Sequence, residues 1–119
     1  MSVQGRFAGL EGYLLSKCVA TRTRAADKDY YDFAYVLMHN RAGGPEQAAD
    51  RLLEGSLADA LGPLRSTFLE VRERYRTSSD PGPAGYARQA IQVEPEATAA
   101  ELRADAVDVV QRFLEALHR

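Results

Sequence analysis

The apolar residues between positions 27 and 40 recur with the period of an α-helix. They stand three and four residues apart: Tyr30, Phe33, Ala34, Leu37 and Met38. This spacing places them on one face of a helix, whereas the apolar residues of a half-buried strand would alternate with polar ones. Asp27 is a favourable N-cap, and Gly43 and Gly44 are typical of the chain that follows a helix. The pattern predicts an amphipathic helix over residues 27–40.

Similar periodicity, interrupted by glycine and proline, predicts further helices along the chain. Their expected ranges are 8–22, 45–54, 56–62, 63–76, a short 86–91 and 96–117. Residues 1–7 are expected to form a short extended lead-in, and residues 77–85 have the composition of a loop. The expected fold is therefore all-α, a small bundle of about five to six short helices in a single helical domain over residues 1–119.

The composition restricts the kind of partner. The chain has 119 residues, of which 27% are charged and 45% hydrophobic, and its formal net charge is −2. Those values are ordinary for a globular domain. A dedicated nucleic-acid-binding protein would carry a clear basic surplus, so nucleic acid is not expected as a partner of this chain alone.

The number of cysteines and the hydropathy of the chain indicate in which cellular compartment the protein is expected. Cys18 is the only cysteine, which excludes an intrachain disulfide and fits a reducing compartment. No apolar run approaches the roughly 18 to 20 residues that span a bilayer, so no membrane association is expected. The first residues also lack the apolar core of a signal peptide. A cytoplasmic protein is the expectation.

Lys17 is the residue whose position most needs a chemical explanation. It falls on the same side of the predicted first helix as Leu10 and Leu14, and Arg24 follows seven residues later on that side. Desolvating an unpaired cation costs several kcal/mol, so we expect an anionic group to meet Lys17. The ordinary alternative is a lysine at the edge of the core whose ammonium group reaches water or an aspartate.

The residues around Lys17 resemble a known family. Leu-Leu-Ser-Lys17, then Arg24, then Lys28-Asp29-Tyr30-Tyr31-Asp32 and an apolar helix resemble the AbiEii-type nucleotidyltransferase toxins of type IV toxin–antitoxin systems. The resemblance is firm over residues 7–44 and consists of helical character alone beyond them. It covers the C-terminal helical part of the family.

The resemblance implies roles for five residues. The lysine that matches Lys17 contacts the triphosphate of the incoming nucleotide, and Asp29 and Asp32 match the last active-site motif of the family. Arg24 and Lys28 are expected as further phosphate contacts, since charge-assisted hydrogen bonds to phosphate are strong. The catalytic candidates are Asp29 and Asp32, which would orient Lys17 or accept a proton from the attacking hydroxyl.

The chain also departs from the family pattern. Such enzymes begin with a sheet that carries a Gly-Ser turn and an Asp-x-Asp pair, which holds magnesium. Gly55-Ser56 has no Asp-x-Asp after it, and Asp27-Lys28-Asp29 is expected to cap a helix. The chain alone is therefore expected to hold no metal, to bind nucleotide in the millimolar range and to be inactive. Magnesium and a nucleoside triphosphate (NTP) are expected as cofactors only if a missing or separate N-terminal half completes the site.

Other functions stay open on the sequence alone. Tyr30, Tyr31 and Tyr35 cover more of their helix than a single core stripe requires, which favours a free-standing interaction module, a homo-oligomer or an antitoxin-like partner. A minor RNA contact through Arg22, Arg24 and Arg88 is less favoured because of the net charge.

The remaining polar residues have simple interpretations. Lys28, Asp29, Asp32 and His39 are expected on the polar side of the 27–40 helix, where Lys28 and Asp32 can form an i,i+4 pair. His39 and His118 lack a second ligand at metal-binding spacing. Cys18 is expected to be a small core residue.

Overall fold

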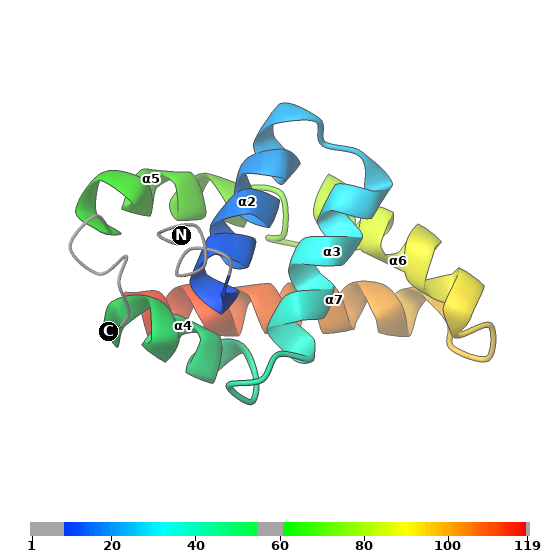
Figure 1. Ribbon diagram of the computed structural model, residues 1–119. Coiled ribbons are helices and arrows are strands. Elements are labelled where there is room, and N and C mark those ends of the chain that lie inside the picture. Colours follow the sequence, from blue (N-terminus) through cyan, green and yellow to red (C-terminus); the bar gives the residue numbers. More distant parts are fainter. Residues whose placement is uncertain (1–8, 55–60, 119) are drawn as a thin grey trace.

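The computed structural model describes residues 9–54 and 61–118, which form six helices and no strand (Figure 1). The helices are α2 (Leu10–Thr23), α3 (Asp27–Met38), α4 (Pro45–Glu54), α5 (Leu61–Arg72), α6 (Pro81–Val93) and α7 (Ala99–Leu117). None of the helices in these two ranges combines the length and the hydrophobicity needed to cross a bilayer. The all-α prediction is confirmed.

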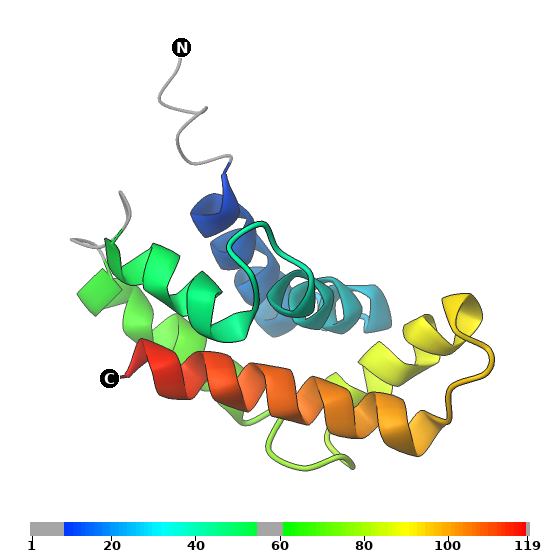
Figure 2. The ribbon, with the colours of Figure 1, turned by 90° about the horizontal axis from the view of Figure 1, so that it is seen from below.

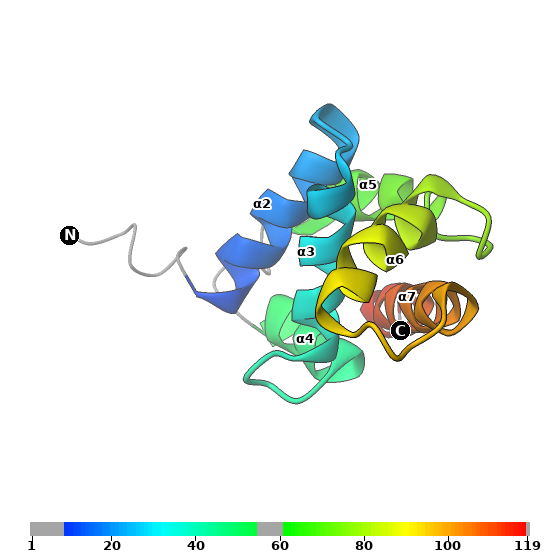
Figure 3. The same cartoon turned by 90° about the vertical axis from the view of Figure 1, so that its right-hand side faces the viewer.

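The longest helix, α7, is the platform on which the bundle is built. Helices α4 and α6 both pack against α7, α4 along the C-terminal half of that helix and α6 along its N-terminal half (Figure 2). Helix α3 packs chiefly against α6 and also against α2, so it lies between these two helices (Figure 3). Helix α5 contacts both α2 and α7.

Four aromatic side chains form the centre of the core. Phe33 of α3 lies with its ring centroid 6.1 Å from that of Phe113 and 6.2 Å from that of Tyr75. Phe68 of α5 contacts Phe113 of α7 at 5.8 Å between centroids. All four are at most 1% exposed. The Tyr75 hydroxyl donates a hydrogen bond of 2.8 Å to the carbonyl oxygen of Tyr30, which satisfies its polar atom inside the core.

The predicted helix 27–40 ends two residues early, and its first residue has another role. Helix α3 ends at Met38, where Asn40 turns the chain through hydrogen bonds of its side chain to the carbonyl oxygens of Val36 and Leu37. Ala26, not Asp27, is the N-cap. The prediction of Asp27 as a cap was wrong because its carboxylate binds Arg88 of α6 through two hydrogen bonds of 2.7 Å.

The predicted loop over residues 77–85 was wrong in its second half. Turns occupy the chain after α5, and α6 begins at Pro81, so Gly82, Pro83 and Gly85 lie within a helix. Proline suits a helix start because it has no N–H to leave unsatisfied and its φ angle is already helical. The short helix predicted over 86–91 is therefore only the middle of a longer one.

Two other helix boundaries also shift. Helix α5 continues through Gly62-Pro63, where a break was predicted, and ends at Arg72. Helix α7 begins at Ala99 because Thr98 and Glu101 form a capping box, in which the Thr98 hydroxyl accepts the Glu101 N–H at 3.1 Å. The predicted lead-in 1–7 and most of the predicted helix 56–62 lie outside the described residues.

Candidate functional site

A tight turn at residues 24–26 brings α2 and α3 side by side. Ala25 has a left-handed φ of +54°, which is unusual for a residue with a Cβ atom. Its N–H donates a hydrogen bond of 3.0 Å to the carbonyl oxygen of Ala20 and closes the end of α2. The chain then returns along α2, so the residues predicted to act together do come from two adjacent helices.

Lys17 meets an aspartate across this helix pair. Its ammonium nitrogen lies 3.1 Å from Oδ2 of Asp32, and the same carboxylate oxygen accepts a hydrogen bond of 2.8 Å from Lys28. The Lys17 nitrogen also lies 5.1 Å from the centroid of the Tyr13 ring, a cation–π contact. An anionic group therefore meets Lys17, as expected, and the Lys28–Asp32 pair is present. The ordinary alternative, a lysine at the edge of the core that pairs with an aspartate, predicted the same contact.

The electrostatics of Asp32 follow from its two cationic partners. Burial raises the pKa of this carboxyl group, but the hydrogen bonds from Lys28 and Lys17 outweigh burial and lower the pKa below its usual value. The hydrogen bond with Asp32 raises the pKa of Lys28 in turn. Asp32 is therefore ionised at neutral pH, and two ammonium groups share one carboxylate.

Asp29 lies in a different environment from the predicted one. It is 3% exposed, although the helical pattern placed it on the polar side of α3. Its Oδ1 accepts a hydrogen bond from Arg24, and its Oδ2 accepts the backbone N–H of Ala26 at 3.0 Å. The prediction of an exposed Asp29 was wrong because the turn that precedes α3 folds over the first turn of that helix.

The remaining predicted arginines have partners in other helices. Arg22 donates a hydrogen bond of 3.1 Å to Glu70 of α5. Arg88 binds Asp27, and this hydrogen-bonded pair lowers the pKa of Asp27 and raises that of Arg88. The name α2–α3 charge cluster is used for two neighbouring groups of ion pairs: Lys17 and Lys28 with Asp32, and Arg24 with Asp29. Its formal charge is +1.

The α2–α3 charge cluster does not suit a divalent metal ion. Magnesium needs carboxylate oxygens that are free to converge on it. Asp29 is buried against Arg24, and Asp32 is shared by two lysines. Over residues 9–54 and 61–118, no group of three histidine, cysteine or acidic residues is placed to hold a metal ion. The cations of the cluster suit phosphate oxygens better.

The three tyrosines of α3 divide between core and surface. Tyr30 is buried, whereas Tyr31 stacks between Tyr35 and Tyr86, with 5.4 Å between ring centroids on each side. Tyr35 is 46% exposed. The stacked tyrosine rings therefore form a row from Tyr86 of α6 across Tyr31 to the exposed ring of Tyr35 on α3.

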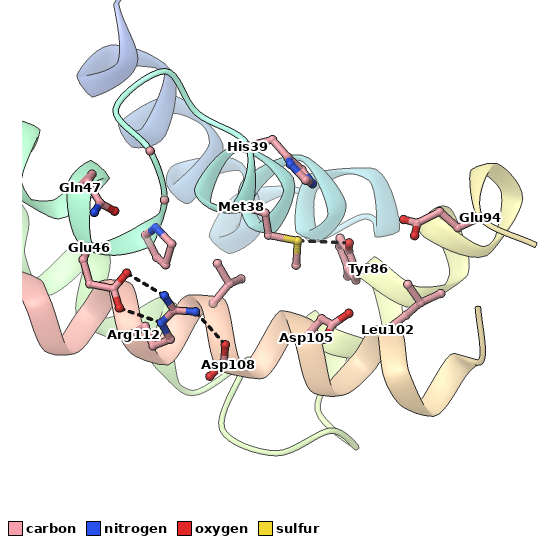
Figure 4. Close-up of a pocket in the computed structure, with 14 residues that line it drawn as sticks. Met38, His39, Glu46, Gln47, Tyr86, Glu94, Leu102, Asp105, Asp108 and Arg112 are labelled. Atoms are coloured by element: carbon pink, nitrogen blue, oxygen red, sulfur yellow. Dashed lines mark hydrogen bonds and ion pairs between the residues drawn. The ribbon is translucent and has the colours of Figure 1, made fainter. Parts of the chain in front are cut away.

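A hollow that Tyr86 and His39 also line is acidic. It measures about 660 Å³ and lies between α3, α4, α6 and α7 (Figure 4). The carboxylates that line it are those of Glu46, Glu94, Asp105 and Asp108. Arg112 is held by Glu46 at 2.7 and 2.9 Å and by Asp108 at 3.1 Å. Burial and the neighbouring acids raise the pKa of Asp105. A phosphate ligand would be repelled here.

Iodoacetamide is expected to leave Cys18 unmodified in the folded protein. The side chain is 0% exposed, and burial raises the pKa of the thiol to about 12. Because the thiolate is the nucleophile, neither access nor ionisation favours the reaction at pH 8. Intact-mass spectrometry should show no adduct on the folded chain and a complete adduct in guanidinium chloride. Equal rates of alkylation in the two states would contradict the burial of Cys18.

Several contacts of the site were not predicted from the sequence. Tyr13 is 42% exposed and lies beneath the Lys17 ammonium group, a contact that was not predicted. The spacing of four residues between Tyr13 and Lys17 places both on one side of a helix, and this contact could have been predicted from it. The contact between Tyr35 and His39, with 4.7 Å between ring centroids, has the same spacing.

No family model, no curated protein and no solved structure matches this chain.

Proposed function

We propose that this chain is the helical C-terminal domain of a nucleotidyltransferase toxin-like protein. In this proposal it supplies phosphate-contacting side chains to an NTP site that a missing or separate N-terminal half completes. The observation that supports the proposal is the contact of Lys17 with Asp32, which lie fifteen residues apart and 3.1 Å from each other. Both belong to the sequence pattern that resembles the family, and together with Arg24 they form one cluster.

The contacts suggest different roles for the residues of the α2–α3 charge cluster. Lys17 and Lys28 would bind triphosphate oxygens, because two cations on one carboxylate leave a positive charge unbalanced. Asp32 would orient both lysines. Its lowered pKa makes it a poor proton acceptor, so orientation is the role we propose for it rather than general base catalysis. Asp29 would position Arg24, whose side chain is 68% exposed.

The metal ions of such a reaction would have to be held elsewhere. The carboxylates of the α2–α3 charge cluster are already bound to cations, so we derive no step through magnesium on this chain. A partner that brings its own pair of acidic residues would supply that part of the site. Without such a partner the proposed domain has no nucleotidyltransferase activity.

Nucleotide binding by the chain alone tests the proposal. We expect a titration of the ¹⁵N-labelled protein with magnesium ATP, GTP, CTP or UTP to shift amide signals in residues 17–32, with a dissociation constant in the millimolar range. Two charge-assisted contacts exceed the entropic cost of association only slightly, which accounts for weak binding. Lys17→Ala should remove the shifts, whereas Arg76→Ala, which changes an exposed arginine far along the chain, should retain them.

Transfer of a labelled nucleotide tests the same proposal with a partner present. The product of the adjacent reading frame, mixed with this chain, should support transfer to RNA or protein, and Lys17→Ala should lower the rate by about a hundredfold or more. The proposal fails if no nucleotide shifts residues 17–32 or if Lys17→Ala leaves binding unchanged.

The second candidate is an interaction module without catalysis. The row of Tyr86, Tyr31 and Tyr35 favours it, because the last ring is exposed on the open face of α3. This candidate predicts a dimer or larger assembly in light scattering, which Tyr35→Ala would dissociate, and no response to nucleotide. A monomer that binds nucleotide through Lys17 would exclude it.

A further inference from the structure

A second hollow, of about 520 Å³, lies where the start of α2, the end of α3 and the last turn of α4 meet. One wall is apolar and is made by Leu10 and Tyr13 of α2 with Val36 of α3. The rim is basic and is made by His39, Arg41 and Arg51. None of these residues belongs to the α2–α3 charge cluster, so this hollow is a separate feature of the surface.

The two arginines of the rim are not neutralised by an acid. Arg22, Arg88 and Arg112 each form an ion pair with an acid of another helix, whereas Arg72, Arg74 and Arg103 have no ion pair within the described residues. Within residues 9–54 and 61–118, neither Arg41 nor Arg51 has a carboxylate within ion-pair distance. Both are exposed. Their guanidinium groups are thus available to a ligand, with several N–H donors each.

The turn that carries Arg41 is held in one conformation. The side-chain amide of Asn40 donates hydrogen bonds to the carbonyl oxygens of Val36, Leu37 and Gly44, at 3.0 to 3.1 Å. Its Oδ1 accepts the N–H groups of Ala42 and Gly43 at 2.9 and 3.0 Å. Arg41 therefore extends from a rigid corner. The last carbonyl groups of α3 are also occupied, which reduces their repulsion of an anion.

The apolar wall indicates which chemical group the ligand would have besides its phosphate. Tyr13 is 42% exposed, and Leu10 and Val36 are half-buried. Covering a partly exposed aromatic ring with an apolar or aromatic group is favourable. A free inorganic ion would use only the rim, whereas a phosphate ester with a carbon skeleton would use both the rim and the wall.

We infer that this hollow is a binding site for an organic phosphate, a phosphate ester on an apolar or aromatic group. The phosphate contacts Arg41 and Arg51 at the rim, and the ester group lies against Tyr13, Leu10 and Val36. Arginine suits this role because its planar group binds phosphate oxygens in pairs. The inference goes beyond the proposed function and does not depend on it, because Arg41 and Arg51 are not part of the α2–α3 charge cluster; Tyr13 adjoins both sites, since its ring also lies 5.1 Å from the Lys17 ammonium nitrogen.

Titration with phenyl phosphate tests the inference. The full chain, labelled with ¹⁵N, is titrated at pH 7.5 and low ionic strength, and amide shifts are expected at Tyr13, Val36, Arg41 and Arg51. Arg41→Gln and Arg51→Gln should each weaken binding about fivefold or more, and the double variant should no longer saturate. Both side chains are exposed, so the variants should keep the circular dichroism spectrum of the original protein.

Three controls separate this site from general charge effects and test the apolar wall. Arg72→Gln and Arg76→Gln each remove one exposed arginine elsewhere on the surface and should leave the affinity unchanged. Inorganic phosphate should bind at least fivefold more weakly than phenyl phosphate, because it leaves the apolar wall uncovered. The inference is overturned if phenyl phosphate does not bind, if the double variant binds it equally well, or if Arg72→Gln weakens it as much. Equal affinity for both phosphates would overturn the role of the wall.

Discussion

Phe33→Ala is expected to lower the free energy of unfolding by about 3–5 kcal/mol, the usual range for a large aromatic residue removed from a core. Phe33 is 0% exposed and contacts Tyr75 and Phe113, so it links α3 to α7 and to the turn after α5. Its removal loses the transfer free energy of the ring and leaves a cavity among aromatic neighbours that cannot easily close. A small domain has only about 5–15 kcal/mol of total stability, so the variant should be close to unfolding.

Urea denaturation followed by far-ultraviolet circular dichroism measures this change. Tyr35→Ala is the matched control, since it removes a ring of similar size from the same helix at a site that is 46% exposed. Its cost should be about 1 kcal/mol or less. Similar losses of stability in the two variants would contradict the placement of Phe33 at the centre of the core.

Gly82→Ala is expected to destabilise the protein by about 1–3 kcal/mol, as overpacking of a tight contact usually does. A Cβ atom at this position would lie 2.5 Å from the carbonyl oxygen of Arg74 and 2.7 Å from the ring of Tyr75. Both groups are fixed, because Gly82 N–H donates a hydrogen bond of 2.8 Å to that carbonyl and Tyr75 is fully buried. Relief of the clash requires the start of α6 to move away from the core.

Gly44→Ala is the matched control for this substitution. Gly44 directly precedes α4, and a Cβ atom there would meet only the end of the Gln47 side chain, at 3.2 Å. A flexible amide can rotate away, so the loss of stability should be smaller than for Gly82→Ala. The shift in the urea midpoint of each variant relative to the original protein measures the two losses of stability. A Gly82→Ala protein as stable as the original would show that α6 does not pack this closely on Tyr75.

The helices whose ends carry strong local signals were predicted well. The range 45–54 for α4 was predicted without error, and α2 and α3 were predicted within two residues at each end. Their boundaries depend on glycine, proline and short-range hydrogen bonds, all of which are visible in a few consecutive residues. The sequence 81–85 was misread because proline and glycine serve both loops and helix starts, and only contact with Tyr75 distinguishes the two.

The candidate site was predicted in part. The expectation of an acid beside Lys17 was right, and so was the pairing of Lys28 with Asp32. The burial of Asp29 was not predicted, because helical periodicity describes the faces of one helix and not what the preceding turn covers. The basic hollow at Arg41 and Arg51 was not predicted either, since its residues come from three helices and the turn between α3 and α4.

The order of apolar residues and chain breakers was sufficient to determine an all-helical chain and the approximate position of each helix, because helix formation depends on neighbours within one or two turns. Which charges neutralise one another was decided only by packing. Arg88 binds Asp27 across 61 positions and Arg112 binds Glu46 across 66, while Arg41 and Arg51 meet no acid in residues 9–54 and 61–118. Charge pairing acts over a few ångströms, and the relative placement of the helices determines which groups come that close.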